Sequence, residues 1–162
     1  MTILFALTLY FIPLFSGPKG IAGIDLILQQ FYETAKEPTD EEVEVMAKVI
    51  HGEAGICSDL QKSAVAWCVC NRVDCGWYSD DVISVITQPH QFHGYSKTKV
   101  PTEQEYKIAY EVLFDWLNGI DLRRTLPRQY IFFHAENHEN VFTTGFKAGD
   151  VWDWSLPNSY KN

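Results

Sequence analysis

Apolar residues recur at helical spacing along most of the chain and predict five helices. Residues 21–35 form the first, and Pro38 ends it. Either Thr39 or Asp40 caps the second, with Glu42 close behind as a capping partner. Its apolar stripe consists of Val43, Met46, Ala47 and Ile50. Gly55 ends this helix.

Three more helices and one strand follow. Ser58 or Asp59 caps a helix over residues 60–73, whose centre is apolar on all sides and predicts a buried helix. A short helix spans 79–87, and Thr102 caps a long one that ends near 117. The stripe predicted for the long helix is Tyr106, Ala109, Tyr110, Leu113 and Trp116.

Only residues 129–135 favour a strand, and the sequence from residue 136 on is rich in turn formers. The pattern therefore predicts a mainly α (α+β) fold with a small β element. We expect a hydrophobic leader and N-terminal helix over residues 1–38, and one catalytic domain over residues 39–162.

Composition places the chain among globular proteins, with 46% hydrophobic and 21% charged residues in 162. The formal net charge is −8, and no basic patch is present, so we expect no nucleic-acid partner. Aromatic residues make up 14%, which suits a core and also a cleft for flat ligands such as sugars.

Residues 3–15 form an uncharged apolar run of 13 residues, too short to span a bilayer comfortably. The length and the small residues Ser16 and Gly17 are typical of a secretory signal, although no basic residue precedes the run and Pro13 interrupts it. The run predicts export or membrane association, and a packing arm is the alternative.

The four cysteines lie within 19 residues, at Cys57, Cys68, Cys70 and Cys75. The alternatives for these cysteines are free buried thiols, one disulfide bond and a metal site. Their spacing matches no strong zinc-binding pattern.

Glu53 lies three residues after Ile50 and seven after Met46, so it falls on the apolar stripe of the second helix. A carboxylate withdrawn from water has a raised pKa, which is what a glycosidase requires of its general acid. The flanking Gly52 and Gly55 would allow a bulky substrate close to the backbone. Alternatively, Glu53 turns out to water or pairs with Arg72.

An ordered set of motifs resembles the SleB-like cell-wall hydrolase family, named for a spore-cortex-lytic enzyme. The segments are GEA at 52–54, AVAWCVCNRV at 64–73, QPHQF at 88–92, NGID at 118–121 and YIFFHA at 130–135. The resemblance runs over residues 42–135. It departs from the family at residues 55–57, where Gly-Ile-Cys replaces Arg-Gly-Glu, and from residue 136 on.

The resemblance implies a lysozyme-like enzyme that cleaves peptidoglycan between N-acetylmuramic acid and N-acetylglucosamine. It implies that Glu53 is the general acid of a lytic transglycosylase, with no cofactor and no metal. In that mechanism the 6-hydroxyl of the sugar replaces water, so one carboxylate suffices. A water-using enzyme would need a second acid, for which Asp59, Asp121 and Glu136 are candidates. The resemblance also implies that the protein comes from a bacterium or a phage. We expect the enzyme to act in the cell envelope or outside the cell.

Other residues are expected to contact the substrate. Gln91 and Phe92 match the family segment and line the cleft, although Phe92 also suits the core. Trp77, Tyr95 and Tyr130 are possible sugar platforms, and His134 at the end of the strand joins the substrate-binding set. Asn71 and Arg72 are interpreted as ties between the helix end and a neighbouring loop.

Three other functions are alternatives to a peptidoglycan glycosidase. A zinc amidase or peptidase would use His134 and His138, with His51, His90 and His93 elsewhere in the sequence, but the full His-Glu-x-x-His motif is absent. A thiol hydrolase would pair Cys57 or Cys75 with His134. A third alternative is a wall-binding or virion structural protein without activity.

Overall fold

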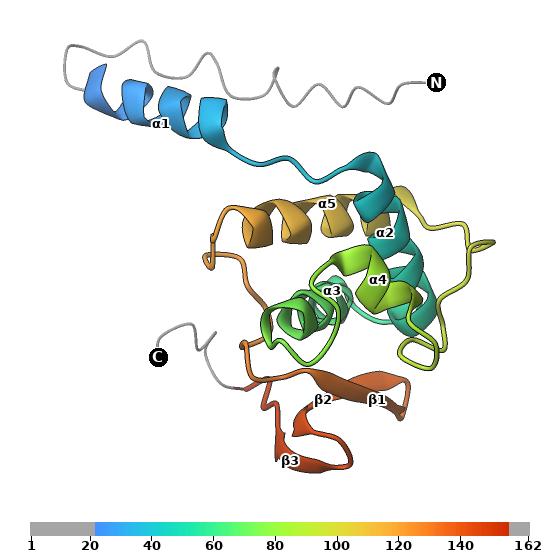
Figure 1. Cartoon of the computed structure of the whole chain (residues 1–162). Helices are drawn as coiled ribbons and strands as arrows, with labels where there is room; N and C mark the ends of the chain where they lie inside the picture. The colour runs from blue at the N-terminus through green and yellow to red at the C-terminus, as the bar shows by residue number, and fades with distance from the viewer. Residues whose placement is uncertain (1–21, 156–162) are drawn as a thin grey trace. The chain divides into compact units, whose positions relative to one another are not determined.

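The computed structural model describes residues 22–155, in which five helices precede a three-stranded sheet (Figure 1). The helices are α1 (Ala22–Thr34), α2 (Asp40–Ala54), α3 (Asp59–Asp74), α4 (Val82–Thr87) and α5 (Glu103–Leu117). The strands are β1 (Phe132–Glu136), β2 (Glu139–Gly145) and β3 (Ala148–Val151). This arrangement confirms the mainly α (α+β) class.

Contacts divide the chain into two units, residues 1–35 and residues 36–162. The first unit contains α1, and the second contains every other described element. The predicted export or membrane segment, residues 3–15, lies outside the described residues. Among the described helices, none is long and apolar enough to cross a membrane.

Side-chain caps define where the helices of the second unit begin. Thr39 caps α2 and exchanges hydrogen bonds with Glu42, and Thr102 and Glu105 form the same capping box on α5. Ser58 caps α3. The helix predicted over 79–87 begins later, because the side chain of Asp81 accepts a 2.7 Å bond from the amide of Ser84 and starts α4 there.

Helix α3 lies at the centre of the core, as its all-round apolar pattern predicted. Every residue from 64 to 72 is buried, and α2, α4 and α5 pack around this helix. The buried face of α5 differs from the predicted stripe. Ala109 and Leu113 are buried as expected, but Ile108 and Val112 are buried as well, whereas Tyr106 is exposed.

Glu105 explains the orientation of α5. Its carboxylate is 1% exposed and lies 2.9 Å from Nδ1 of His51 in α2 and 3.4 Å from Nζ of Lys62 in α3. Burial acts to raise the pKa of Glu105, but the Thr102 amide and the two basic side chains outweigh it and lower that pKa below its usual value. One buried carboxylate therefore joins three helices.

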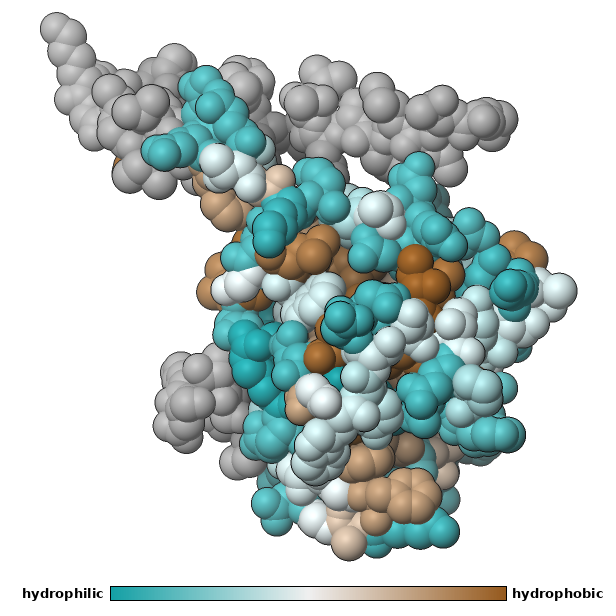
Figure 2. Space-filling model, viewed as in Figure 1, coloured by the Kyte–Doolittle hydropathy of each residue, from teal (hydrophilic) through white to brown (hydrophobic). Residues whose placement is uncertain are grey.

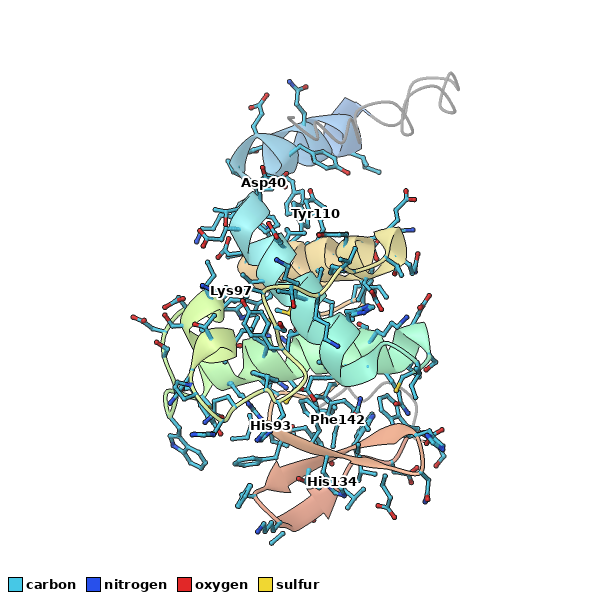
Figure 3. The ribbon with its side chains drawn as sticks, turned by 90° about the vertical axis from the view of Figure 1, so that its right-hand side faces the viewer. Asp40, His93, Lys97, Tyr110, His134 and Phe142 are labelled. Carbon is cyan, nitrogen blue, oxygen red and sulfur yellow. The ribbon has the colours of Figure 1, made fainter. Side chains whose placement is uncertain are left out.

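The sheet is antiparallel in the order β1-β2-β3. The predicted strand at 129–135 begins three residues late, and β2 and β3 occupy the region interpreted as turns. The β1–β2 turn consists of Asn137 and His138, both with positive φ (50° and 69°), as a tight hairpin turn requires. Phe142 projects from β2 toward the helices and is fully buried (Figure 3). Part of the surface over the sheet is hydrophobic (Figure 2). Phe146, in the β2–β3 turn, and Val151, in β3, are exposed.

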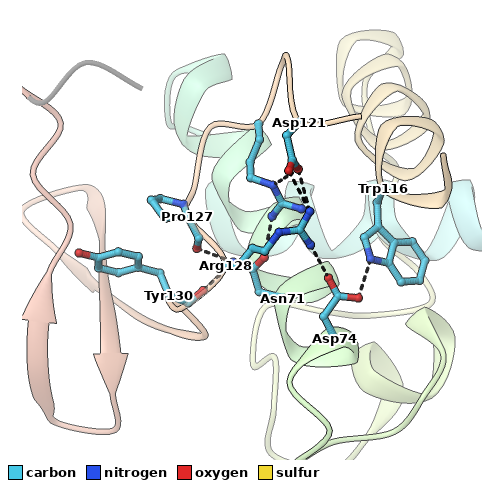
Figure 4. Close-up of polar contacts among 8 residues, drawn as sticks. Asn71, Asp74, Trp116, Asp121, Pro127, Arg128 and Tyr130 are labelled. Carbon is cyan, nitrogen blue, oxygen red and sulfur yellow. Dashed lines mark hydrogen bonds and ion pairs between the residues drawn. The ribbon is translucent and has the colours of Figure 1, made fainter. Parts of the chain in front are cut away.

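Asn71 and Arg72 tie the end of α3 to the segment before β1, which confirms that interpretation. Nδ2 of Asn71 donates to the carbonyl oxygens of Pro127 (2.8 Å) and Tyr130 (3.0 Å), as Figure 4 shows. Nε of Arg72 donates a 2.7 Å bond to the carbonyl of Ile131. These bonds fix where the sheet joins the helices.

The four cysteines are free thiols in this structure, and no two of them form the disulfide bond that was one of the alternatives. Cys68 and Cys70 are buried in α3, and burial raises the pKa of Cys68 to about 11. Cys57 and Cys75 are partly exposed.

Candidate active site

Glu53 is the penultimate residue of α2, and its side chain is half-buried. Oε1 accepts a 2.6 Å hydrogen bond from the main-chain amide of Gly94, which lies in the loop between α4 and α5. No described residue hydrogen-bonds to Oε2. The carboxyl group is thus held at one oxygen, and the other oxygen is free to carry or accept a proton.

The helix and the loop approach each other backbone to backbone. A Cβ atom placed on Gly52 would lie 1.9 Å from the carbonyl oxygen of Gly94, and one on Gly94 would lie 2.3 Å from that of Gly52. Neither position tolerates a side chain unless the loop moves away. Gly52 therefore makes room for the loop that positions Glu53, rather than for a substrate.

Asn140 holds the hairpin against the same end of α2. The residue is buried, and its Nδ2 donates a 3.0 Å bond to the carbonyl oxygen of Glu53. Its main-chain amide donates a 2.9 Å bond to Oε1 of Gln61 in α3. Glu53 is thus positioned from two sides, by the loop at its carboxylate and by β2 at its backbone.

A hollow of about 240 Å³, here called the Glu53 hollow, opens beside this carboxylate. The ends of α2 and of the β1–β2 hairpin form it, and Figure 1 shows these two ends side by side. Its lining residues are Glu53, Ile56, Cys57, Ala135, Glu136, Asn137, His138, Glu139 and Asn140. Two further acids, Glu136 and Glu139, line this hollow as well, and the carboxylate of Glu136 lies 3.7 Å from Nε2 of His134.

The other carboxylates considered for a second acid serve the fold. Asp59 accepts a 2.9 Å bond from Gln104, and Asp121 pairs with Arg124 and Arg128 (Figure 4). Burial acts to raise the pKa of Asp121, but the two guanidinium groups outweigh it and lower the pKa. Of the three candidates, only Glu136 lines the Glu53 hollow.

Arg72 does not pair with Glu53. Its guanidinium bonds the Ile131 carbonyl and Oε1 of Gln91 (3.3 Å), and lies over the ring of Phe92, 4.5 Å from the centroid. Gln91 and Phe92 thus fix the start of the loop that carries Gly94. Phe92 is 7% exposed, so its ring belongs to the core and is not open to a sugar in this structure.

The remaining predicted contacts lie in different places. Tyr130 is 7% exposed and packs edge-on against Trp152, so its ring is closed as well. Tyr95 is half-buried next to Gly94. Trp77 is 77% exposed, in the α3–α4 loop.

His134 lies on the outer face of the sheet. Side chains alternate along a strand, so His134 lies on the face of β1 opposite Phe133 and Ala135. Phe133 packs on Phe142 in the core, and Ala135 lines the Glu53 hollow. The imidazole is 3.7 Å from Glu136 and is exposed. Within residues 22–155, no group of three or more His, Cys, Asp or Glu side chains is arranged to hold a metal ion.

Three residues of this site were not predicted from the sequence: Gly94, Glu139 and Asn140. Gly94 follows the QPHQF segment by two residues, and that proximity was the only local signal for it. Nothing local marks Asn140, because its partners are 79 and 87 residues away in sequence.

Comparison with protein families matches residues 58–150 to the family described as Cell Wall Hydrolase. The match covers more than half of the chain, which therefore belongs to the cell wall hydrolase family. The match includes β2 and most of β3, so the chain follows the family past residue 136, contrary to expectation. Glu53 lies five residues before the matched segment. Searches of curated proteins and of solved structures find no match, and the lysozyme-like fold stays a prediction.

Proposed function

We propose that this cell wall hydrolase is a peptidoglycan glycosidase, and that Glu53 is its general acid and base. The observation that carries the proposal is the Glu53 carboxyl group itself. It is half-buried, held at Oε1 by the Gly94 amide and free at Oε2 beside an open hollow. A group fixed in this way can deliver a proton to one defined place.

The chemistry that fits one such group is lytic transglycosylation. Protonated Oε2 gives its proton to the glycosidic oxygen as the bond from that oxygen to C1 of N-acetylmuramic acid breaks. The 6-hydroxyl of the same sugar then attacks C1, and its proton passes to Glu53. The products are a 1,6-anhydro end and a free 4-hydroxyl on N-acetylglucosamine, and Glu53 returns to its protonated form.

Hydrolysis is the second candidate, and the presence of Glu136 and Glu139 in the Glu53 hollow favours it. In an inverting hydrolase one of these carboxylates would activate a water molecule. Among the described residues, no cluster of side chains could hold the zinc ion that the amidase or peptidase alternative requires.

Mass spectrometry of the soluble products from purified peptidoglycan tests the proposal. Anhydro ends that persist in Glu136→Gln and Glu139→Gln would support transglycosylation. Hydrated reducing ends that are lost in one of these variants would mean hydrolysis with that acid. Peptides without glycan cleavage would refute both forms of the proposal.

We further propose that the enzyme acts outside the cytoplasm, since its substrate lies there. Export by the apolar run at residues 3–15, or release as a phage lysin, would both place it there. The first route is tested by fusing residues 1–20 to a reporter enzyme that works only outside the cytoplasm. A fusion without reporter activity would exclude export by this segment.

A further inference from the structure

A second hollow, here called the Trp77 hollow, lies at the turn between α3 and α4. It measures about 460 Å³ and shares no lining residue with the Glu53 hollow. The lining residues that bear on its chemistry are Trp77, Tyr78, Ser79, Ser84 and Gln88. We propose that the Trp77 hollow is an accessory glycan-binding subsite, which takes a neutral N-acetylated sugar ring of the peptidoglycan strand.

Trp77 supplies the platform. The indole is 77% exposed, whereas Trp67 is fully buried and Trp152 is 7% exposed. Exposed to this extent, the ring contributes little to the core, and its apolar face is open to a ligand. A sugar ring has one face of C–H groups, and an exposed indole that borders polar groups offers a complementary surface.

The lining of the Trp77 hollow supplies polar partners that carry no charge themselves. Among the described residues, none hydrogen-bonds to the side chains of Ser79 or Gln88, so their hydroxyl and amide groups are available, whereas the Ser84 hydroxyl bonds to the Asp81 carboxylate. The lining contains no Asp, Glu, Lys, Arg or His. An uncharged, hydroxyl-rich ligand such as an N-acetylated sugar suits this lining better than a phosphate, a nucleic acid or a charged peptide.

The residues on either side of Trp77 have defined conformations. Gly76 precedes it with φ +72°, a conformation that favours glycine. Tyr78 follows it, and the Arg72 guanidinium lies 5.2 Å from the centre of the Tyr78 ring. Because Arg72 is itself bonded to Ile131, the Tyr78 side of the subsite is anchored to the core.

The two hollows are linked by a short stretch of chain. Gln88 lines the Trp77 hollow, and Gly94, six residues later, contacts the Glu53 carboxylate. Chain length alone keeps these two residues within about 20 Å of each other. A strand of several sugars bound at Trp77 can therefore extend toward Glu53. This last step rests on the proposed function, whereas glycan binding at Trp77 does not.

Binding measured without cleavage tests the inference. In the Glu53→Gln background, a soluble N-acetylglucosamine tetramer is titrated while tryptophan fluorescence is followed, and sedimentation with purified peptidoglycan gives wall binding. We expect Trp77→Leu to weaken both by about tenfold, and Trp77→Tyr, which keeps an aromatic face, to stay within about threefold of the parent. Phe146→Leu, at an exposed ring on the sheet, is the matched control.

Equal binding by Trp77→Leu and its parent would overturn the inference, as would an equal loss in Phe146→Leu. The result is independent of the proposed function. Binding that depends on Trp77, in a protein that cleaves no glycan, would refute the proposed function alone. Cleavage that depends on Glu53, with binding indifferent to Trp77, would refute this inference alone.

Discussion

The main-chain amide of Gly94 donates a 2.6 Å hydrogen bond to Oε1 of Glu53, across 41 residues of sequence. The bond forms because Gly52 and Gly94 lack side chains and allow the loop to rest directly on α2. The position of the carboxyl group therefore depends on two glycines that carry no chemistry of their own.

Replacing Gly94 with alanine should lower kcat by roughly 100-fold, because the added Cβ would displace the loop and the amide that holds Glu53. Lys97→Ala, at an exposed position in the same loop, is the control. Rates of fragment release from purified peptidoglycan measure the effect, and circular dichroism checks the fold. A Gly94→Ala enzyme with more than half of the wild-type rate would show that the contact does not position Glu53.

Asn140→Ala should reduce both stability and turnover. The change removes a donor to the Glu53 carbonyl, and a lost buried hydrogen bond costs about 1–3 kcal/mol in the free energy of unfolding. Val141→Thr, at the next residue on the other face of β2, should leave turnover within about twofold, because the side chain of Val141 is only half-buried and points away from Glu53. Urea unfolding and kcat are the measurements. Normal kcat in a destabilised Asn140→Ala would make the residue structural only.

Glu105 should make the protein sensitive to acid. Its pKa in the folded state is lower than the ordinary value of 4.5, so its contribution to stability is complete above that pH and is lost as the pH falls through the folded pKa. Between pH 5.5 and pH 3.5, wild type should lose stability more steeply than Glu105→Gln.

Glu103→Gln, at an exposed position in the first turn of the same helix, should keep the wild-type slope. Urea unfolding at a series of pH values gives the three slopes. Parallel slopes for wild type and Glu105→Gln would contradict this role for Glu105.

The four cysteine thiols should differ in their reactivity in the native protein. Cys57 and Cys75 are partly exposed and should react with a thiol reagent in the native protein, whereas Cys68 and Cys70 should react only after unfolding. Titration in denaturant without reductant should give four thiols. A count of two would mean that a disulfide forms in solution.

The helices were predictable because their signals are local. The Thr39–Glu42 and Thr102–Glu105 capping boxes each lie within four residues of sequence, and the apolar centre of α3 predicted its burial. The rotation of α5 was not predictable in this way. The position of Glu105 depends on His51 and Lys62, which reach it from two other helices.

The sheet and the site depend on contacts that are distant in sequence. The β1–β2 turn uses Asn137 and His138 at positive φ instead of an Asn-Gly pair, and this concealed the hairpin. The proposed role of Glu53 rests on its place on an apolar stripe and on the GEA motif. Its partners Gly94 and Asn140 could not be predicted, because only the folded loop and hairpin bring them to it.

The most direct measurement of the central claim is the rate at which Glu53→Gln releases soluble glycan fragments from purified peptidoglycan. Glu44→Gln is its control, since Glu44 lies on the same helix in an exposed ion pair with Lys48. The account predicts a loss of roughly 10²–10⁴-fold for Glu53→Gln, as expected on removal of a general acid, and a wild-type rate for Glu44→Gln. A folded Glu53→Gln enzyme that keeps the wild-type rate would contradict the claim that Glu53 performs the chemistry.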